Sequence, residues 1–200
     1  MTTKDQGRLV IISGPSGAGK STVVRRLIQQ CDLPLRLSIS ATTRRPRSGE
    51  MDGIDYFFMD QEAFDRCREE DGFLECKEVF GLGYWYGTLR EQVASGLSRG
   101  HWVILEIDVQ GALAILDQHE LQAISIFLHP GGIEELEHRL RNRKTESEEE
   151  ICARLETACS EMRYMHRYQY EVVNDSVDNA VDEICQKLMQ HKENHSCSKS

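Results

Sequence analysis

The sequence lacks any apolar run long enough to cross a membrane, and residues 1–8 contain no apolar core of a signal peptide. It is also poor in basic residues, since 24 Lys and Arg stand against 33 Asp and Glu and give a formal net charge of −9. A chain this acidic has no general attraction for nucleic acid or for an anionic membrane. We therefore predict a cytoplasmic protein in which any basic cluster binds a small ligand.

The cysteines lack the spacing of a metal site or of a redox pair. There are seven, an odd number, and no two of them form a CxxC motif. We expect buried, reduced thiols, as in a reducing cytosol, and neither a disulfide framework nor a zinc site. The seven histidines lack a ligand motif such as HExxH, and we assign none of them a role. The cysteines are Cys31, Cys67, Cys76, Cys152, Cys159, Cys185 and Cys197.

Short apolar runs alternate with amphipathic stretches along most of the chain. The runs at 8–12, 102–107 and 123–128 predict strands that are buried on both faces. Residues 35–40 alternate, and residues 170–173 are a weaker strand candidate. Helical periodicity lies between these segments. This order predicts an α/β fold in three layers, with a mainly parallel sheet between helices.

Residues 41–90 break this rhythm, because they are rich in Gly, Arg, Asp and Tyr and contain only short β-like pieces. We interpret them as an inserted subdomain that projects from the carboxyl edge of the sheet, where α/β proteins bind ligands. Residues 1–40 and 91–190 would then form the core. The polar tail, residues 191–200, is expected to be flexible.

The strongest local signal is the GxxxxGKS motif that begins at Gly14. An apolar strand candidate precedes it and an amphipathic helix follows, as a phosphate-binding loop (P-loop) requires. Glycines let successive N–H groups turn toward phosphate oxygens, and the helix adds its positive N-terminal end. Lys20 should reach the β- and γ-phosphates of ATP, and the Ser21 hydroxyl should bind Mg²⁺. The alternative is an ordinary glycine-rich turn. The residues predicted to bind ATP here are Gly14, Pro15, Ser16, Gly17, Ala18, Gly19, Lys20, Ser21 and Thr22.

A cluster of three arginines, Arg44, Arg45 and Arg47, lies in the insertion of this otherwise acidic protein. One guanidinium group can bind two oxygens of a phosphate at once, and tyrosine hydroxyls can complete such a site. The cluster therefore predicts an anionic ligand. The alternative is a basic loop in solvent.

Several motifs resemble those of the guanylate kinase family. They stand in family order and cover residues 8 to about 188. The resemblance implies an ATP-dependent nucleoside monophosphate kinase that phosphorylates GMP, with Mg²⁺ as cofactor. The motifs are Ser40-x-x-x-Arg44-x-Pro46-Arg47-x-Gly49-Glu50, Asp55-Tyr56-x-Phe58, Phe73-Leu74-Glu75, Tyr86-Gly87-Thr88, Glu106-Ile107-Asp108-x-Gln110-Gly111 and Val173-Asn174-Asp175.

The resemblance also implies which residues hold the GMP phosphate. These are Arg44, Arg47, Tyr56 and Tyr86, while Glu50 would help to orient the loop. The tyrosines could instead be packing aromatics. The turn before Tyr86 is about two residues longer than is usual in the family, so Tyr84 could take its place; we choose Tyr86.

By the same resemblance, Glu75 would accept hydrogen bonds from guanine N1–H and from the exocyclic amine. Ser40 and Thr88 would donate to guanine O6, and Asp108 would add a contact beside the amine. Adenine would leave such buried groups unpaired, so the set would select guanine. The plainer alternatives stay open: Thr88-x-x-Glu91 is also a capping box, Glu75 could lie in solvent, and Asp108 could support Mg²⁺.

A helical lid over residues 141–154 completes what the resemblance implies. Ser147-x-x-Glu150 is a capping box and predicts a helix start. Arg139, Arg143 and Arg154 would cover the phosphates when the lid closes, although a solvated pair of helices with i,i+4 ion pairs is an alternative.

The predicted chemistry needs no general base, because a GMP phosphate oxygen is already charged at neutral pH. Lys20, Arg44 and the three lid arginines are the predicted catalytic residues, and Asn174 is a predicted ATP contact. Glu106 stands where the family often has Asp, so its role is left open.

Two other functions stay open. One is a P-loop kinase for another phosphorylated acceptor, such as a ribose bisphosphate, although a sugar would give Glu75 no base to recognise. The other is a non-catalytic guanylate kinase-like binding module, which would bind little ATP. The oligomeric state and the use of dGMP are not indicated by the sequence.

Overall fold

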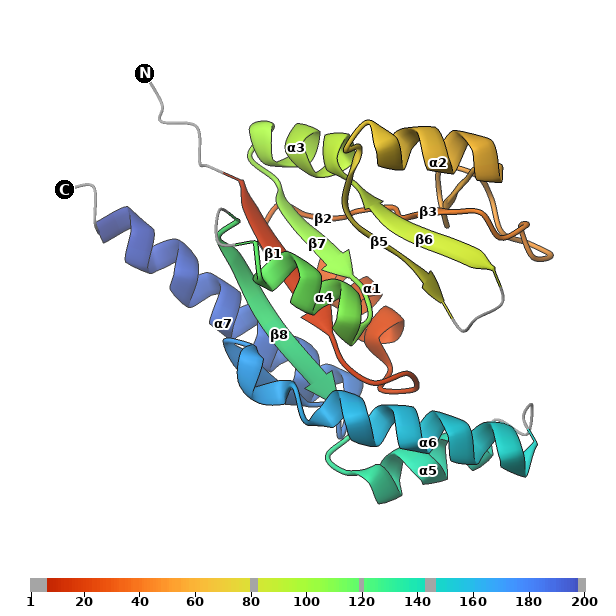
Figure 1. The fold of residues 1–200 in the computed structure, drawn as a ribbon. Helices are drawn as coiled ribbons and strands as arrows, with labels where there is room; N and C mark the ends of the chain where they lie inside the picture. Colours follow the sequence, from red (N-terminus) through yellow and green to blue (C-terminus); the bar gives the residue numbers. More distant parts are fainter. Residues whose placement is uncertain (1–6, 80–82, 119–120, 143–146, 198–200) are drawn as a thin grey trace. The chain divides into compact units, whose positions relative to one another are not determined.

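The computed structural model describes residues 7–79, 83–118, 121–142 and 147–197. They form an α/β structure with two sheets, one of five strands and one of four (Figure 1). The chain divides into two compact units. The first takes in the described residues of 1–10, 36–105 and 110–123, and the second those of 11–35, 106–109 and 124–200.

The larger sheet has the strand order β2-β7-β1-β8-β9. β1, β7 and β8 form where the sequence has an apolar run, and β8 and β9 pair in parallel from Ile126 opposite Tyr170 to His129 opposite Val173. The predicted α/β fold with a mainly parallel sheet is confirmed. The strands are Arg8–Ser13 (β1), Leu35–Leu37 (β2), Trp102–Glu106 (β7), Ala123–His129 (β8) and Tyr170–Val173 (β9).

Two strands of this sheet illustrate how burial shapes the sequence. After Arg8, every residue of β1 is buried, which explains its unbroken apolar run. β2 ends at Leu37, earlier than predicted, and only Leu35 of its three residues is buried. The alternation expected from the sequence is therefore not seen in its burial, because Leu37 is 43% exposed.

The helices begin where capping groups or sharp turns allow. In α6 the predicted capping box is present, because Ser147 Oγ accepts from the Glu150 N–H at 3.3 Å and Glu150 Oε2 accepts from the Ser147 N–H at 2.8 Å. The predicted box at Thr88 is wrong, since the residue before α3 is Leu89 and has no side-chain cap. The helices outside the smaller sheet are Lys20–Gln30 (α1), Arg90–Ser98 (α3), Val109–Leu116 (α4), Ile133–Asn142 (α5), Glu148–Met162 (α6), the 3₁₀ turn Met165–Arg167 (η1) and Val177–Cys197 (α7).

The smaller sheet belongs to the first unit and has the order β4-β3-β6-β5. Its core contains Ala41, Phe64 and Phe73, and the two phenyl rings stack with centroids 4.5 Å apart. All four strands lie within residues 41–90, the segment that we predict to be an insertion. The elements are Ala41–Thr42 (β3), Phe57–Phe58 (β4), Gln61–Glu69 (α2), Phe73–Val79 (β5) and Tyr84–Leu89 (β6).

Most of the predicted tail, residues 191–197, is helical in the described part of the chain. Helix α7 continues through Cys197, well beyond residue 190. The Tyr170 hydroxyl lies 2.9 Å from His191 Nε2, and the two rings meet edge to face. A polar composition suggested fraying, but this contact with β9 holds the start of the tail in the helix. No helix among the described residues has the length and apolarity needed to span a membrane.

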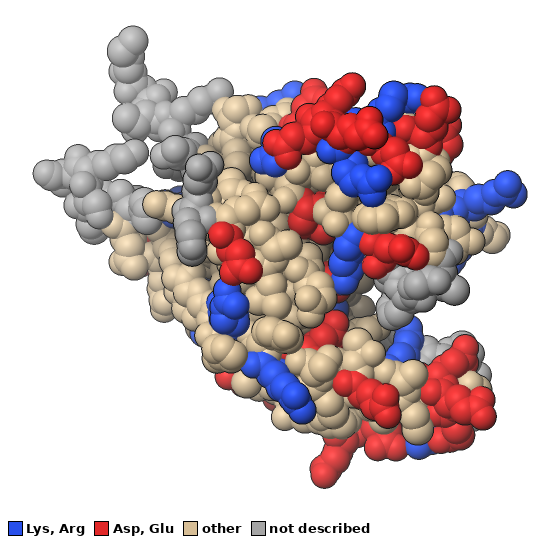
Figure 2. Space-filling view, viewed as in Figure 1, with Lys and Arg blue, Asp and Glu red and all other residues tan. Residues whose placement is uncertain are grey.

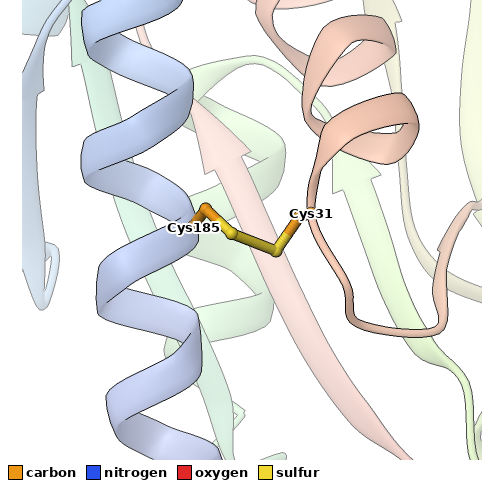
Figure 3. Close-up of a disulfide and its surroundings, with 2 residues drawn as sticks. All are labelled: Cys31 and Cys185. Atoms are coloured by element: carbon orange, nitrogen blue, oxygen red, sulfur yellow. A yellow bond between two sulfur atoms is a disulfide. The ribbon is translucent and has the colours of Figure 1, made fainter.

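Two of the seven cysteines form a disulfide, so the prediction of reduced thiols throughout is wrong. Cys31 follows α1 and Cys185 lies in α7, and their Cα atoms are 5.8 Å apart (Figure 3). The sequence could not indicate this pair, because it spans 154 positions and depends on the packing of α1 against α7. Burial raises the pKa of two other thiols, Cys67 and Cys76. The free described thiols are Cys67, Cys76, Cys152 and Cys159.

Replacing Cys185 by Ser should lower the free energy of unfolding by about 2–5 kcal/mol, because a cross-link over so long a loop restricts the unfolded chain. Denaturant unfolding under oxidising conditions measures the loss, with Cys159→Ser as the control at an exposed free thiol. Thiol titration of the unfolded wild type should detect two thiols fewer than the seven in the sequence. A full count of seven, with equal stabilities of the two variants, would contradict the disulfide.

Candidate active site

The loop between β1 and α1, residues 14–19, has the shape of an anion cradle. Gly14 and Gly19 have φ of 145° and 87°, values that L side chains rarely adopt. A side chain at Gly14 would overlap the Leu128 carbonyl oxygen, and one at Gly19 would come 2.6 Å from Asn174 Nδ2. Among the described residues, the Gly17 and Gly19 N–H groups have no acceptor. They are therefore available to phosphate oxygens at the positive end of α1.

Lys20 folds back onto this loop. Its Nζ donates to the carbonyl oxygens of Gly14 at 2.7 Å and Pro15 at 3.0 Å. Burial lowers the pKa of Lys20, while the carboxylates of Glu106, Glu161 and Asp108 oppose that shift. The ammonium group thus lies in a dry place and is held by weak neutral acceptors. An anionic phosphate would be a stronger partner for it.

Two carboxylates accompany Lys20 and Ser21. The Ser21 hydroxyl donates to Glu106 Oε1, and Asp108 is close enough to affect the Lys20 ammonium. Sequence reasoning left Glu106 without a role, although a carboxylate at the end of an apolar strand was a usable signal. Among the described residues, no group of three or more His, Cys, Asp or Glu could hold a metal. Mg²⁺ needs fewer, since it is usually bound by one or two carboxylates with water and phosphate oxygens.

Asn174 joins three parts of the second unit. Its side chain is buried, and Nδ2 donates to the Ala18 carbonyl oxygen at 2.7 Å. Its backbone N–H donates to the His129 oxygen at 2.7 Å, and its own carbonyl accepts from Arg139 Nη2 at 2.7 Å. Asn174 thus holds both the loop and Arg139, and its contact with ATP stays a prediction.

A pocket of about 370 Å³ lies beside the loop within this unit. Gly17, Gly19 and Thr22 contribute the loop and the first turn of α1, and Val177 contributes an apolar surface. Thus the predicted residue Thr22 lines a space next to the cradle. The other lining residues are Arg139, Asn142, Asn174 and Asp175.

The predicted lid falls on α5 and α6, which lie side by side (Figure 1). Leu136, Leu140 and Ala158 form their common core. Arg139 Nε donates to Glu135 Oε1 at 2.8 Å, so this arginine is held from two sides. Arg154 is half-buried in α6, whereas Arg143 lies outside the described residues.

Arg44 and Glu50 form an ion pair at the centre of the arginine cluster in the first unit. Arg44 Nη1 and Nη2 donate to the two Glu50 oxygens, each at 2.9 Å. This fork lowers the pKa of Glu50, with help from the Arg47 N–H, which donates at 2.7 Å. It also raises the pKa of Arg44 further above its ordinary value. Glu50 therefore fixes Arg44 and binds the backbone of the loop at Arg47.

Two tyrosines surround Arg44. Its Nε donates to the Tyr86 hydroxyl oxygen at 3.0 Å, and its guanidinium carbon lies 5.4 Å from the centre of the Tyr56 ring. Since Tyr86 Oη accepts here, its own hydrogen can point to an anion. Tyr84 is 41% exposed, and no described residue binds its hydroxyl. The arrangement therefore favours Tyr86 over Tyr84. The Arg47 guanidinium makes no hydrogen bond or ion pair with any described residue, although its charge helps to lower the pKa of Glu50.

Glu75 and Thr88 face each other across β5 and β6. Thr88 is almost fully buried, and its hydroxyl donates to Glu75 Oε1 at 2.7 Å. This bond explains the absence of a cap at Thr88, because the residue is still part of the strand. The Thr88 hydroxyl has only one hydrogen, and we predict that it donates to guanine O6. In this structure that hydrogen is bound to Glu75, so Thr88 orients Glu75 instead. Ser40 belongs to the same unit, and its carbonyl accepts from the Phe57 N–H at 2.9 Å.

The predicted site residues thus fall into two groups. The ATP-binding set and Asp108 lie in the second unit. The set predicted to bind the acceptor lies in the first: Ser40, Arg44, Arg47, Glu50, Tyr56, Glu75, Tyr86 and Thr88.

Comparison with known proteins adds an independent line of argument. The family model described as guanylate kinase matches residues 6–192. The chain is 62% identical over 198 residues to a guanylate kinase of Rhodopirellula baltica, covering 99% of this chain and 95% of the relative. It is 49% identical over 184 residues to one from Caldanaerobacter subterraneus subsp. tengcongensis, covering 92% and 87%. The crystal structure of guanylate kinase from Anaplasma phagocytophilum aligns with a TM-score of 0.74 at 32% identity, covering 94% and 87% of the two chains.

Replacing Asn174 by Ala should lower the free energy of unfolding by about 1–3 kcal/mol, because the buried Ala18 carbonyl loses its donor. Urea unfolding measures the change. Asn179→Ala is the matched control, since the side-chain amide of Asn179 makes only one exposed hydrogen bond, to Asp175 Oδ1 at 3.3 Å. Equal stability of the two variants would show that Asn174 does not hold the loop.

Proposed function

Because the chain belongs to the guanylate kinase family, we infer that it transfers the γ-phosphoryl group of ATP to GMP and that the two groups of residues above bind these nucleotides. It is an ATP:GMP phosphotransferase, a nucleoside monophosphate kinase. The site assignment depends on one observation: the same chain contains a complete phosphate loop and, in its other unit, a cluster of arginines and tyrosines together with the carboxylate of Glu75. A non-catalytic binding module has no use for the intact loop.

We propose that the arginine–tyrosine cluster holds the phosphate of GMP. Arg44 has five N–H donors, and four are already used by Glu50, the Arg45 carbonyl and Tyr86. Its role is then to stand as a fixed positive charge with one free donor. Arg47 brings a whole guanidinium fork to the phosphate, and Tyr86 adds a hydroxyl hydrogen.

The base of GMP is proposed to bind at Glu75. A carboxylate can accept from N1–H and from the exocyclic amine of guanine, whereas adenine has an acceptor at N1 and no such amine. Thr88 holds Oε1 of Glu75 in place, which limits the reorientation needed on binding. If Thr88 also donates to guanine O6, it must first release Glu75, so Ser40 is the simpler donor.

For ATP, we propose that the phosphates lie along the loop and that the adenosine part uses the neighbouring pocket of about 370 Å³. Lys20 would exchange the carbonyl oxygens of Gly14 and Pro15 for the β- and γ-phosphates. Ser21, Glu106 and Asp108 suit Mg²⁺, because a hydroxyl and two carboxylates are the hard oxygen ligands that it prefers. When bound, Mg²⁺ neutralises charge on the β- and γ-phosphates.

The transfer itself needs alignment and positive charge more than proton transfer. The attacking GMP oxygen is anionic at neutral pH, so none of the described side chains has to remove a proton. Lys20, Arg44 and the lid arginines would stabilise the charge that spreads over the transferred group. Arg139, held by Glu135 and Asn174, is the best positioned lid arginine among those described.

The direct test is ADP release in a coupled assay with ATP and Mg²⁺, comparing GMP, AMP, UMP and CMP as acceptors. Turnover with GMP alone is expected. Turnover with another acceptor would keep the phosphate loop and discard the guanine site at Glu75. ATP binding without turnover would point to an acceptor outside this panel, and no ATP binding would favour the binding module.

Replacing Lys20 by Ala should lower kcat by about 100-fold or more, since a charge that stabilises the transition state is removed. The same coupled assay measures this, and thermal unfolding should show a preserved fold. Lys187→Ala is the control, because Lys187 lies in α7 and pairs there with Glu183. A well-folded Lys20→Ala variant with normal turnover would contradict the proposed cradle.

Replacing Tyr86 by Phe should raise the KM for GMP by about tenfold, because a hydrogen bond to a charged phosphate is lost. Tyr84→Phe should change it by less than about twofold, since that hydroxyl is exposed and has no described partner. Steady-state kinetics with varied GMP decide between them. The reverse order would give the phosphate contact to Tyr84.

A further inference from the structure

A second pocket, of about 260 Å³, lies within the first unit between β2, α3 and β7. Arg36 and Ser38 contribute to it from β2 and the residue after it, and Gly96 contributes from α3. Arg99 and His101 contribute from the connection between α3 and β7. None of the residues assigned to ATP or GMP lines this pocket, so the nucleotide sites do not explain it.

The charge of the pocket is unusual for this protein. Two arginines and a histidine line it, and no Asp or Glu of the described part of the chain does, although the net charge of the chain is −9. The guanidinium groups of Arg36 and Arg99 make no hydrogen bond or ion pair with any residue that the structure describes. By contrast, Arg44 and Arg139 are each held by a carboxylate. Two arginines at one pocket without counter-charges favour an anionic ligand.

A neutral donor accompanies the two arginines. Ser38 Oγ is buried and has no hydrogen-bond partner among the described residues. A buried hydroxyl without a partner is unfavourable, so a ligand oxygen that accepts its hydrogen would be favoured. Gly96 of α3 and Val103 of β7, which both line the pocket, pack closely against each other, because a Cβ at Gly96 would come 2.6 Å from Val103 Cγ2. The close contact of α3 with β7 therefore keeps the pocket in shape.

One feature opposes an anion, namely the negative carboxyl end of α3 near the pocket. Two carbonyl groups in its last turn are already bound. The Gly96 oxygen accepts from the N–H groups of Arg99 and His101, and the Leu97 oxygen accepts from the Gly100 N–H. Partial charges that are satisfied in this way repel an anion less than two full guanidinium charges attract it.

We propose that this pocket is a binding site for a small phosphate-bearing anion, separate from both nucleotide sites. Its volume is below the 300–1,000 Å³ or so that is usual for drug-sized ligands, so a complete nucleotide would not fit inside. Free phosphate and a small phosphate monoester share the required chemistry. Arg36 and Arg99 bind the phosphate oxygens, and the Ser38 hydroxyl donates to one of them.

The test is a titration of the full chain with inorganic phosphate and, separately, with ribose 5-phosphate, followed by the assigned backbone amide resonances. Gly96 reports on this pocket and Gly19 on the phosphate loop, so binding at the two places is read separately. A saturable shift of Gly96 is expected with at least one probe. The probe that binds more tightly then identifies the free phosphate or the monoester as the better ligand.

Variants locate the binding. Arg99→Gln and Arg36→Gln should each raise the dissociation constant read from Gly96 by about tenfold, because each removes charge-assisted hydrogen bonds. The value read from Gly19 should not change. Arg163→Gln, at an exposed arginine outside the pocket, is the control for loss of one positive charge. The proposal is overturned if Gly96 does not shift at concentrations that saturate Gly19, or if Arg99→Gln leaves the Gly96 titration unchanged.

Discussion

The hydrogen bond from the Asn174 side chain to the Ala18 carbonyl oxygen fixes the phosphate loop to the sheet. It spans 156 positions of sequence, and it brings Asn174 so close to Gly19 that a side chain at position 19 would have to displace the Asn174 amide. The Asn174 backbone binds His129 of β8 and, through its carbonyl, Arg139 of α5. N–H groups that face a ligand cannot also form hydrogen bonds within the protein. Such a loop is therefore held in place through its carbonyl groups. Asn174 supplies that hold.

A second constraint is that three of the cations assigned to phosphate binding, Lys20, Arg44 and Arg139, already have partners within the protein. Lys20 rests on two carbonyl oxygens, and Arg44 and Arg139 rest on carboxylates. These partners differ in strength. Neutral carbonyls are readily replaced by a phosphate, whereas the fork between Arg44 and Glu50 is a charge-assisted pair. We therefore expect Lys20 to move when a phosphate binds, and Arg44 to stay and keep its neighbours, Tyr56 and Tyr86, in place.

Apolar periodicity was enough to predict the central strands, because β1, β7 and β8 are buried on both faces and read as unbroken apolar runs. The phosphate loop was equally readable, since its glycines follow from local backbone geometry. The features that could not be predicted depend on contacts between residues that are distant in the sequence or lie on neighbouring strands. The pairing of Cys31 with Cys185 follows from the packing of α1 on α7, and the use of the Thr88 hydroxyl follows from its register with Glu75. The role of Glu106 at Ser21 was missed, although its position at a strand end hinted at it.

The net charge of −9 has to be reconciled with two anionic substrates. Acidic side chains gather over α5 and α6 in the view of Figure 2, where Glu134, Glu135 and Glu148 to Glu150 lie in the first turns. On α2, acids alternate with arginines that pair with them. Exposed charges of this kind are screened within about 8–10 Å at physiological salt. A buried ammonium such as that of Lys20 is screened much less. Affinity for phosphate therefore depends on local geometry, namely converging donors in dry places, and the overall acidity of the chain opposes it only weakly.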